Sequence, residues 1–224
     1  FVPFTECLHV AKADQGIRVV CDVLDRLVSS PLRTLGHPRA EYVPKLYDRA
    51  RRLEGMPLTY SAATGILKRR RKHFAVVSGT YNPQFFPGGE TDGPIGAVVL
   101  GRALEQLGHR VTFCCEEQII PAVAGMAKAA GAKGDYQGLT IGDPDKHACL
   151  ARHFDAAVFI EKIGTNRKGV HHTSSGLASD TDDADLSGFV QELARRGRYT
   201  IGLGDGGNEI GFGSIAAYAR RVVR

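Results

Sequence analysis

Short apolar runs alternate with amphipathic segments from about residue 73 to the end of the chain. A strand buried on both faces is a continuous run rich in β-branched and aromatic residues, whereas a helix places apolar residues three and four positions apart. These patterns predict strands over 74–77, 111–115, 136–141, 156–160 and 199–203, the third of them weak. They also predict helices over 94–107, 119–130, 144–152, 186–196 and 215–223.

The first 72 residues show helical spacing alone. Apolar residues that lie three or four positions apart predict helices over 17–27, 43–53 and 61–72, with proline and glycine between them. We therefore expect a helical N-terminal extension over residues 1–60, followed by an α/β domain over residues 61–224.

Strands that alternate with helices predict an α/β fold, with a mostly parallel sheet sandwiched by helices and a helical N-terminal extension. In an open parallel sheet, ligands bind beyond the carboxyl ends of the strands, near the point where the strand order reverses. The residues that follow the predicted strands are therefore the candidates for chemistry.

The net charge of +5 is unevenly distributed. Residues 1–73 carry a net charge of +7, and residues 74–224 carry −2. The basic run over 68–72 has no interleaved aromatic residues, and cations suit the end of a helix, so we expect no nucleic-acid partner. No apolar run reaches 18 residues, so we expect no membrane partner.

The five cysteines include no C-x-x-C pair, and their odd number argues against a disulfide framework. Reduced thiols are typical of the cytoplasm or of the mitochondrial matrix. The first residues lack the basic and apolar regions of a signal peptide. The expected location is therefore cytoplasmic, with the mitochondrial matrix as the alternative in a eukaryote.

Carboxylates flanked by glycines follow three of the predicted strands. Glu90 and Asp92 follow the first strand, Glu161 follows the fourth, and Asp205 and Glu209 follow the last. Because the carboxyl ends of parallel strands lie at one edge of the sheet, we expect these five side chains to converge.

Five converging carboxylates form an acidic rim, and their negative charge requires neutralisation by protons, by Lys162 or by a divalent cation. Oxygen ligands suit hard ions, so Mg²⁺ and Mn²⁺ are expected first, with Ca²⁺ as an alternative. The pattern therefore predicts a metal-supported acid–base site. For Asp92 and Asp205, the alternative interpretation is that each caps the N-terminus of a helix.

Gly202, Gly204 and Gly207 match the G-x-G-x-x-G spacing of dinucleotide-binding loops. Asp205 and Glu209 would face the pyrophosphate of a bound dinucleotide, and no acidic residue follows them to hold a ribose. We therefore expect no nucleotide cofactor.

Three motifs resemble the signatures of the D-glutamate cyclase C-terminal-like domain. They are PQFFPGGETDGPIGA at 83–97, EKIGTNRKG at 161–169 and GDGGNEIG at 204–211. The resemblance covers roughly residues 60–224. It implies a family domain that usually continues beyond the helix that follows the third motif. It implies a lyase that acts on a small amino acid, converting D-glutamate to 5-oxo-D-proline and water.

Lactam closure by these motifs can be written as a hypothesis, in which Glu90 takes the ammonium proton and His172 protonates the leaving oxygen. The predicted catalytic residues are Glu90, Glu161, Glu209 and His172. The predicted metal ligands are Asp92, Glu161, Asp205 and Glu209. The predicted substrate-binding residues, which include the donors to the oxyanion, are Asn166, Gly206, Gly207 and Asn208.

Two other functions stay open at this point. A carboxylate rim with a divalent ion also suits a metal-dependent phosphohydrolase. The same residues would serve a non-catalytic domain that binds a metal or an amino acid. Self-association into a homo-oligomer is an open alternative for the partners.

Overall fold

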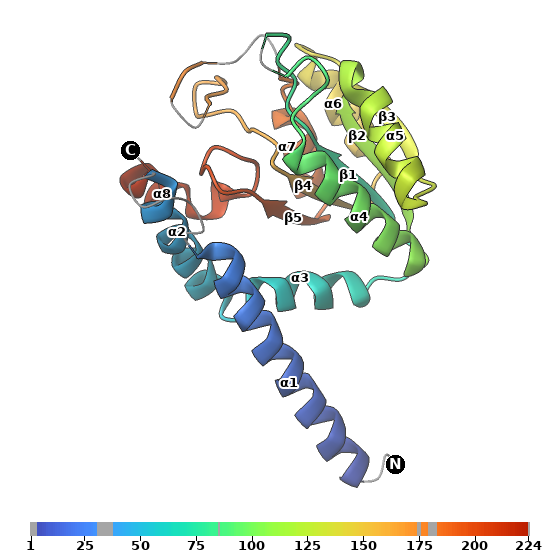
Figure 1. The fold of residues 1–224 in the computed structure, drawn as a ribbon, viewed down its shortest axis with the longest axis vertical. Helices are drawn as coiled ribbons and strands as arrows, with labels where there is room; N and C mark the ends of the chain where they lie inside the picture. Colours follow the sequence, from blue (N-terminus) through green and yellow to red (C-terminus); the bar gives the residue numbers. More distant parts are fainter. Residues whose placement is uncertain (1–3, 31–37, 85, 174–175, 179–182, 224) are drawn as a thin grey trace. The chain divides into compact units, whose positions relative to one another are not determined.

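The computed structural model describes the chain except residues 1–3, 31–37, 85, 174–175, 179–182 and 224, and except the side chains of 4–13 and 38–40. The chain divides into two compact units (Figure 1). The first unit comprises Phe1–Lys68 and Ser214–Arg224, and the second comprises Arg69–Gly213. The domain limits expected from the sequence stay a prediction.

The second unit contains a five-stranded sheet in which every neighbouring pair of strands is parallel. The strand order is β3-β2-β1-β4-β5. The strands are β1 (His73–Ser78), β2 (Arg110–Glu116), β3 (Asp135–Leu139), β4 (Ala156–Ile160) and β5 (Tyr199–Leu203). The predicted α/β fold and its five strands are confirmed.

Helices cover both faces of this sheet (Figure 1). One face carries α4 (Asp92–Gln106) and α5 (Ile120–Ala130), and the short 3-10 turn η1 (Glu117–Ile119) precedes α5. The other face carries α6 (Pro144–Ala151) and α7 (Ser187–Arg195). The central strands are therefore buried on both faces, which explains why they are continuous apolar runs.

Side chains alternate between the two faces along each central strand. Val77 of β1 and Phe159 of β4 belong to a buried cluster with Phe189 and Leu193 of α7. On the opposite face, α4 approaches β2 so closely that a Cβ on Gly101 would come within 2.4 Å of the Phe113 ring. The sheet and its two helical layers thus form one core.

The first unit is helical throughout its described regular structure. It contains α1 (Phe4–Ser29), α2 (Pro38–Glu54), α3 (Leu58–Leu67) and α8 (Ala216–Val222), and the 3-10 turn η2 (Phe212–Ile215) precedes α8. The three predicted N-terminal helices and the C-terminal helix are confirmed. The third predicted helix is shorter than expected at its C-terminal end, where Arg71 adopts a φ of +48° that a helix cannot contain.

The apolar spacing that predicted α1 does not mark its packed face. That face carries the buried residues Cys21 and Asp25, and α1 contacts α3. The four apolar residues that define the spacing are exposed, namely Ile17, Val20, Leu24 and Leu27. The spacing therefore predicted the helix but not the side through which it packs in this unit.

Asp25 of α1 accepts hydrogen bonds from the first turn of α3. Its Oδ2 accepts from the Leu58 N–H at 2.6 Å, and its Oδ1 accepts from the Thr59 N–H at 3.1 Å and from the Thr59 hydroxyl. The N-cap residue of α3 is Pro57, which makes no side-chain capping bond. Asp25 therefore caps α3 from a different helix.

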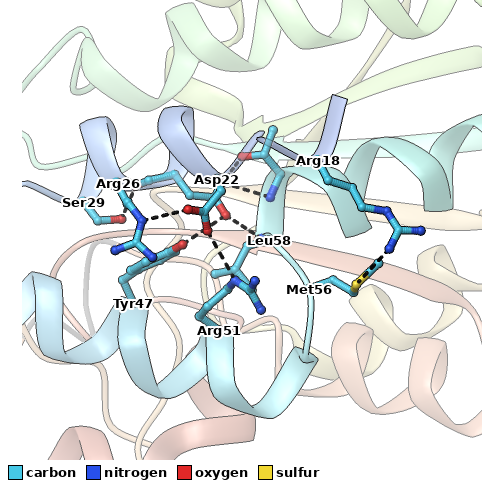
Figure 2. A network of polar contacts seen from close by, with 10 residues as sticks. Arg18, Asp22, Arg26, Ser29, Tyr47, Arg51, Met56 and Leu58 are labelled. Atoms are coloured by element: carbon cyan, nitrogen blue, oxygen red, sulfur yellow. Dashed lines mark hydrogen bonds and ion pairs between the residues drawn. The ribbon is translucent and has the colours of Figure 1, made fainter. Parts of the chain in front are cut away.

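Replacing Asp25 with alanine is expected to destabilise the first unit by about 1–3 kcal/mol, because two backbone N–H groups lose their acceptor. The measurement is the free energy of unfolding in urea. Asp22→Asn is the matched control, since Asp22 pairs with Arg26 and Arg51 in a more exposed network (Figure 2). Equal losses in the two variants would contradict the capping role.

The described cysteines Cys21, Cys114, Cys115 and Cys149 are free thiols. The Cys7 side chain lies outside the described residues, and the expectation of reduced cysteines in the chain stays a prediction. Within the described residues, no helix combines the length and hydropathy needed to cross a membrane.

Candidate functional site

The carboxyl ends of β1, β4 and β5 lie next to one another at one edge of the sheet. The strand order runs from β1 towards β3 on one side and from β4 towards β5 on the other, so it reverses between β1 and β4. Such a switch point is where open parallel sheets bind ligands. The three motif-bearing strand exits meet there.

Glu161 leaves β4 in an unusual backbone conformation, with a φ of +50°. A residue other than glycine in this region carries strain that its surroundings must offset. Its N–H donates to the Leu203 carbonyl oxygen at 3.0 Å, which ties the turn to the end of β5. At the start of α4, a Cβ on Gly93 would come within 3.1 Å of the Glu161 Cβ and 2.6 Å of the Ser78 Oγ. Glycine at position 93 therefore leaves room for α4 to begin in contact with the residues at the ends of β1 and β4.

Glu209 lies inside the glycine-rich loop that follows β5. Its Oε1 accepts from the Gly206 N–H at 2.6 Å and from the Asp205 N–H at 3.0 Å. A Cβ on Gly204 would come within 2.7 Å of the Glu209 Cδ, so the loop closes around this side chain only with glycine there. Glu209 is 8% exposed, and its Oε2 is buried without a hydrogen-bond partner. A buried carboxylate oxygen of this kind calls for a proton or a cation.

Glu161, Asp205 and Glu209 each place one carboxylate oxygen within 4.8 Å of the others. Glu209 is buried, and the other two are half-buried. Three carboxylates at this spacing repel one another unless they share a proton or a cation. Their oxygen-only donor set fits Mg²⁺, Mn²⁺ or Ca²⁺. Three of the four predicted metal ligands are thus brought together.

The two remaining predicted carboxylates lie on the β1 side of the switch point. Asp92 is the first residue of α4, and its Oδ1 accepts from the Gly93 N–H at 3.0 Å. Among the residues that the structure describes, the close group of carboxylates does not include Asp92 or Glu90. The Glu90 N–H donates to the Thr80 carbonyl oxygen at 3.1 Å. The roles predicted for Glu90 and Asp92 stay predictions.

The alternative interpretation as helix caps is wrong for Asp205, whereas Asp92 lies one residue inside α4 and accepts from an N–H of its first turn. No helix begins directly after Asp205, because the next helical segment is η2 at Phe212. The N-cap of α4 is Thr91, and Asp92 already lies within the helix. Asp205 is instead held in the loop that surrounds Glu209.

The loop that follows β4 contains a chain of side-chain hydrogen bonds. The Asn166 Oδ1 accepts from the N–H groups of Lys168 at 2.7 Å and Val170 at 3.2 Å, so its amide nitrogen faces the His172 Nε2 at 2.8 Å. The His172 Nδ1 lies 3.2 Å from the Gly176 carbonyl oxygen. Both contacts are satisfied when the proton is on Nδ1 and Nε2 accepts.

These contacts constrain the predicted roles. His172 would have to release Asn166 before its Nε2 could donate a proton to a leaving group. The Gly206 N–H already donates to Glu209, and the Asn208 Nδ2 donates to the His172 carbonyl oxygen at 2.6 Å. The catalytic role of His172 and the substrate-binding roles of Asn166, Gly206, Gly207 and Asn208 stay predictions.

Lys162 does not neutralise the three carboxylates, although the sequence made it a candidate. Its side chain is fully buried, pairs with Glu116 at the end of β2 and donates to the Gly79 carbonyl oxygen at 2.9 Å. Sequence reasoning did not single out Glu116. The available signal was a carboxylate that ends a continuous apolar strand, because a buried carboxylate requires a partner.

The fold and the site define an open parallel α/β protein with three carboxylates at the switch point of its sheet. A family model described as D-glutamate cyclase-like, C-terminal, matches residues 48–224, and the chain belongs to this family. A human relative named "D-glutamate cyclase, mitochondrial" is 27% identical over 157 residues. The match covers 62% of this chain and 25% of the human protein, so the chain spans about a quarter of that relative's length.

A solved structure that overlaps this chain is a short-chain dehydrogenase/reductase from Serratia marcescens BCRC 10948. The identity is 21%, the overlap covers 69% of this chain and 64% of that chain, and the TM-score is 0.37.

Proposed function

We propose that this chain is a D-glutamate cyclase-like lyase that converts D-glutamate to 5-oxo-D-proline and water, with a divalent cation held by Glu161, Asp205 and Glu209. The observation that carries the proposal is the convergence of these three carboxylates, one of which, Glu209, has a buried Oε2 without a hydrogen-bond partner. Family membership and the name of the human relative support the choice of reaction.

Lactam closure joins the amino nitrogen of glutamate to its γ-carboxyl carbon and breaks one carbon–oxygen bond of that carboxyl group. The substrate ammonium loses two protons and the leaving oxygen gains two, so that water is released and the net charge is unchanged. A site for this reaction must accept a proton near the nitrogen, return protons to the oxygen and offset the negative charge of the γ-carboxylate. A bound divalent cation would supply the last requirement as a Lewis acid.

The side chains of the site suit the remaining requirements. Glu209 is held through Oε1 by two N–H groups, which leaves Oε2 as its ligand atom. Glu161 is half-buried and carries a second oxygen that is proposed, with Glu90, to accept the ammonium proton. Asn208, whose amide is oriented by its bond to the His172 carbonyl oxygen, is proposed to orient a substrate carboxylate.

Titration with Mn²⁺ is expected to show one ion per chain and to raise the Tm. A ligand present at a hundred times its Kd stabilises a protein by about 2.7 kcal/mol, which corresponds to about 5–10 °C for a chain of this size. The loaded chain is then expected to convert D-glutamate to 5-oxoproline, and EDTA is expected to stop the reaction. Product formation can be followed by chromatography.

The same assay separates the other candidate functions when L-glutamate and p-nitrophenyl phosphate are offered in parallel. Phosphate release without cyclisation would favour a metal-dependent phosphohydrolase and contradict the lyase. Stabilisation by Mn²⁺ or by an amino acid without turnover would favour a non-catalytic binding domain. The name of the human relative places that protein in mitochondria, which supports a mitochondrial location for a eukaryotic source; within it we propose the matrix, and the cytoplasm is proposed otherwise.

A further inference from the structure

Lys162 is a fully buried lysine that follows the proposed metal ligand Glu161 in the chain. Its Nζ pairs with the Glu116 Oε1, donates to the Gly79 carbonyl oxygen at 2.9 Å and lies 3.8 Å from the Asp183 Oδ1. The side chains of Lys162 and Glu116 are both 0% exposed. One ammonium group therefore connects the exits of β1, β2 and β4 with the segment that precedes α7.

Lys162 and Glu161 extend in opposite directions along the strand order. Lys162 reaches across the end of β1 to Glu116 on β2, whereas Glu161 reaches the carboxylates of the loop beyond β5. This divergence coincides with the φ of +50° at Glu161. Because a glutamate disfavours this conformation, neighbouring contacts must hold the turn. On the β2 side, the buried ion pair of Lys162 with Glu116 is a charge-assisted contact that can do so.

The main chain of Lys162 continues the connection towards Glu209. The Lys162 carbonyl oxygen accepts from the Ile210 N–H at 2.8 Å, and the Gly164 N–H donates to the Asn208 carbonyl oxygen at 2.9 Å. The residues on both sides of Glu209 are therefore bonded to the turn that Lys162 anchors. A shift of that turn would move two of the three carboxylates at once.

The buried ammonium of Lys162 and the buried carboxylate of Glu116 each need the other as an ionic partner. The Glu116 Oε1 also accepts from the Ala184 N–H at 3.1 Å, and its Oε2 is buried without a hydrogen-bond partner. Burial, with a smaller contribution from Glu116, raises the pKa of the neighbouring Cys115 thiol to about 12, so this thiol stays protonated and does not compete for Lys162. Removal of one partner of a buried pair leaves an uncompensated charge, so the pair acts as a unit.

We propose that Lys162 is a positioning residue, which acts through Glu116 and Gly79 to hold Glu161 and the Glu209 loop at the spacing that binds a divalent cation. The inference rests on the proposed metal site and adds to it a residue that touches neither the cation nor the substrate. Replacement of Lys162 is therefore expected to weaken the affinity for the cation, in addition to any change in the stability of the fold.

Lys162→Met removes the ammonium group and keeps most of the side-chain volume. We expect the Kd for Mn²⁺, measured from the free-ion EPR signal well below the Tm, to rise by at least about tenfold, as for residues that orient metal ligands. The Tm is expected to fall as well, because Glu116 is left charged and buried. The Tm alone would not distinguish positioning from a purely structural role.

Two further variants separate the two effects. Lys162→Met with Glu116→Gln removes the unpaired charge and keeps an acceptor for the Ala184 N–H, so the Tm is expected to recover while the Kd for Mn²⁺ stays at least about tenfold raised. Leu193→Ala, in the buried core of α7, is expected to lower the Tm with no change in the Kd.

The double variant, Lys162→Met with Glu116→Gln, tests the positioning role even if Lys162→Met alone does not fold. A Kd equal to that of the unaltered chain in the double variant would overturn the positioning role and leave the metal site standing. Absence of Mn²⁺ binding by the unaltered chain would overturn the metal site, and the positioning role with it.

Discussion

Glu209→Gln is expected to reduce the turnover of D-glutamate at least about a hundredfold, since loss of a residue that only orients a metal ligand already costs 10–100-fold. The glutamine oxygen can still accept from the Asp205 and Gly206 N–H groups. Its amide nitrogen then replaces the buried Oε2 and offers N–H groups where a cation needs a lone pair. The measurements are kcat at saturating Mn²⁺ and the Kd for Mn²⁺.

Glu105→Gln is the matched control for this substitution. Glu105 lies in the last turn of α4, and its carboxylate accepts from the Lys133 N–H, a bond that glutamine can keep. Turnover and Mn²⁺ affinity are expected to be unchanged in this variant. Retention of full turnover by Glu209→Gln would contradict the assignment of Glu209 to the site.

Gly204→Ala is expected to have the second largest effect. The added Cβ would come within 2.7 Å of the Glu209 Cδ and 2.9 Å of its Cβ, so the carboxylate must move. The φ of Gly204 is not in the left-handed region, so the effect is steric and not a loss of backbone freedom. We expect the Kd for Mn²⁺ to rise at least about tenfold and the stability to fall by about 1–3 kcal/mol.

Gly88→Ala is the control for this steric effect. Gly88 lies in the first glycine-rich motif, its φ is also outside the left-handed region, and a Cβ there would meet no atom within 4 Å. Affinity and stability are expected to change little. A Gly204→Ala variant that behaves like Gly88→Ala would show that the loop does not need to close around Glu209.

The strands of the second unit could be predicted because burial on both faces leaves a simple pattern. Apolar runs such as 74–77 and 156–160 have few other interpretations next to glycine-rich loops. The edge strand β3 gave a weak signal because most of its residues are exposed or half-buried. In α1 the apolar spacing predicted the helix, yet the face that packs carries Cys21 and Asp25.

The site could be predicted in part for a topological reason. Parallel strands place their carboxyl ends at one edge, so Glu161, Asp205 and Glu209 were expected to meet, and their oxygens lie within 4.8 Å of one another. The same reasoning could not say that Asp92 would bond to the first turn of α4, nor that the His172 Nε2 would face Asn166. Side-chain direction at a turn depends on contacts that strand order does not specify.

The sequence by itself determined the α/β class, the strand exits and the motifs that carry the carboxylates, because periodicity and glycine spacing are local properties. The tertiary structure alone decided which way Lys162 points. Its partner Glu116 lies 46 residues earlier in the chain and belongs to a strand that is not adjacent to β4 in the sheet. A carboxylate stabilises a buried ammonium, so the position of Glu116 in space, and not its place in the sequence, makes Lys162 the partner of an interior carboxylate instead of a counter-ion for the site.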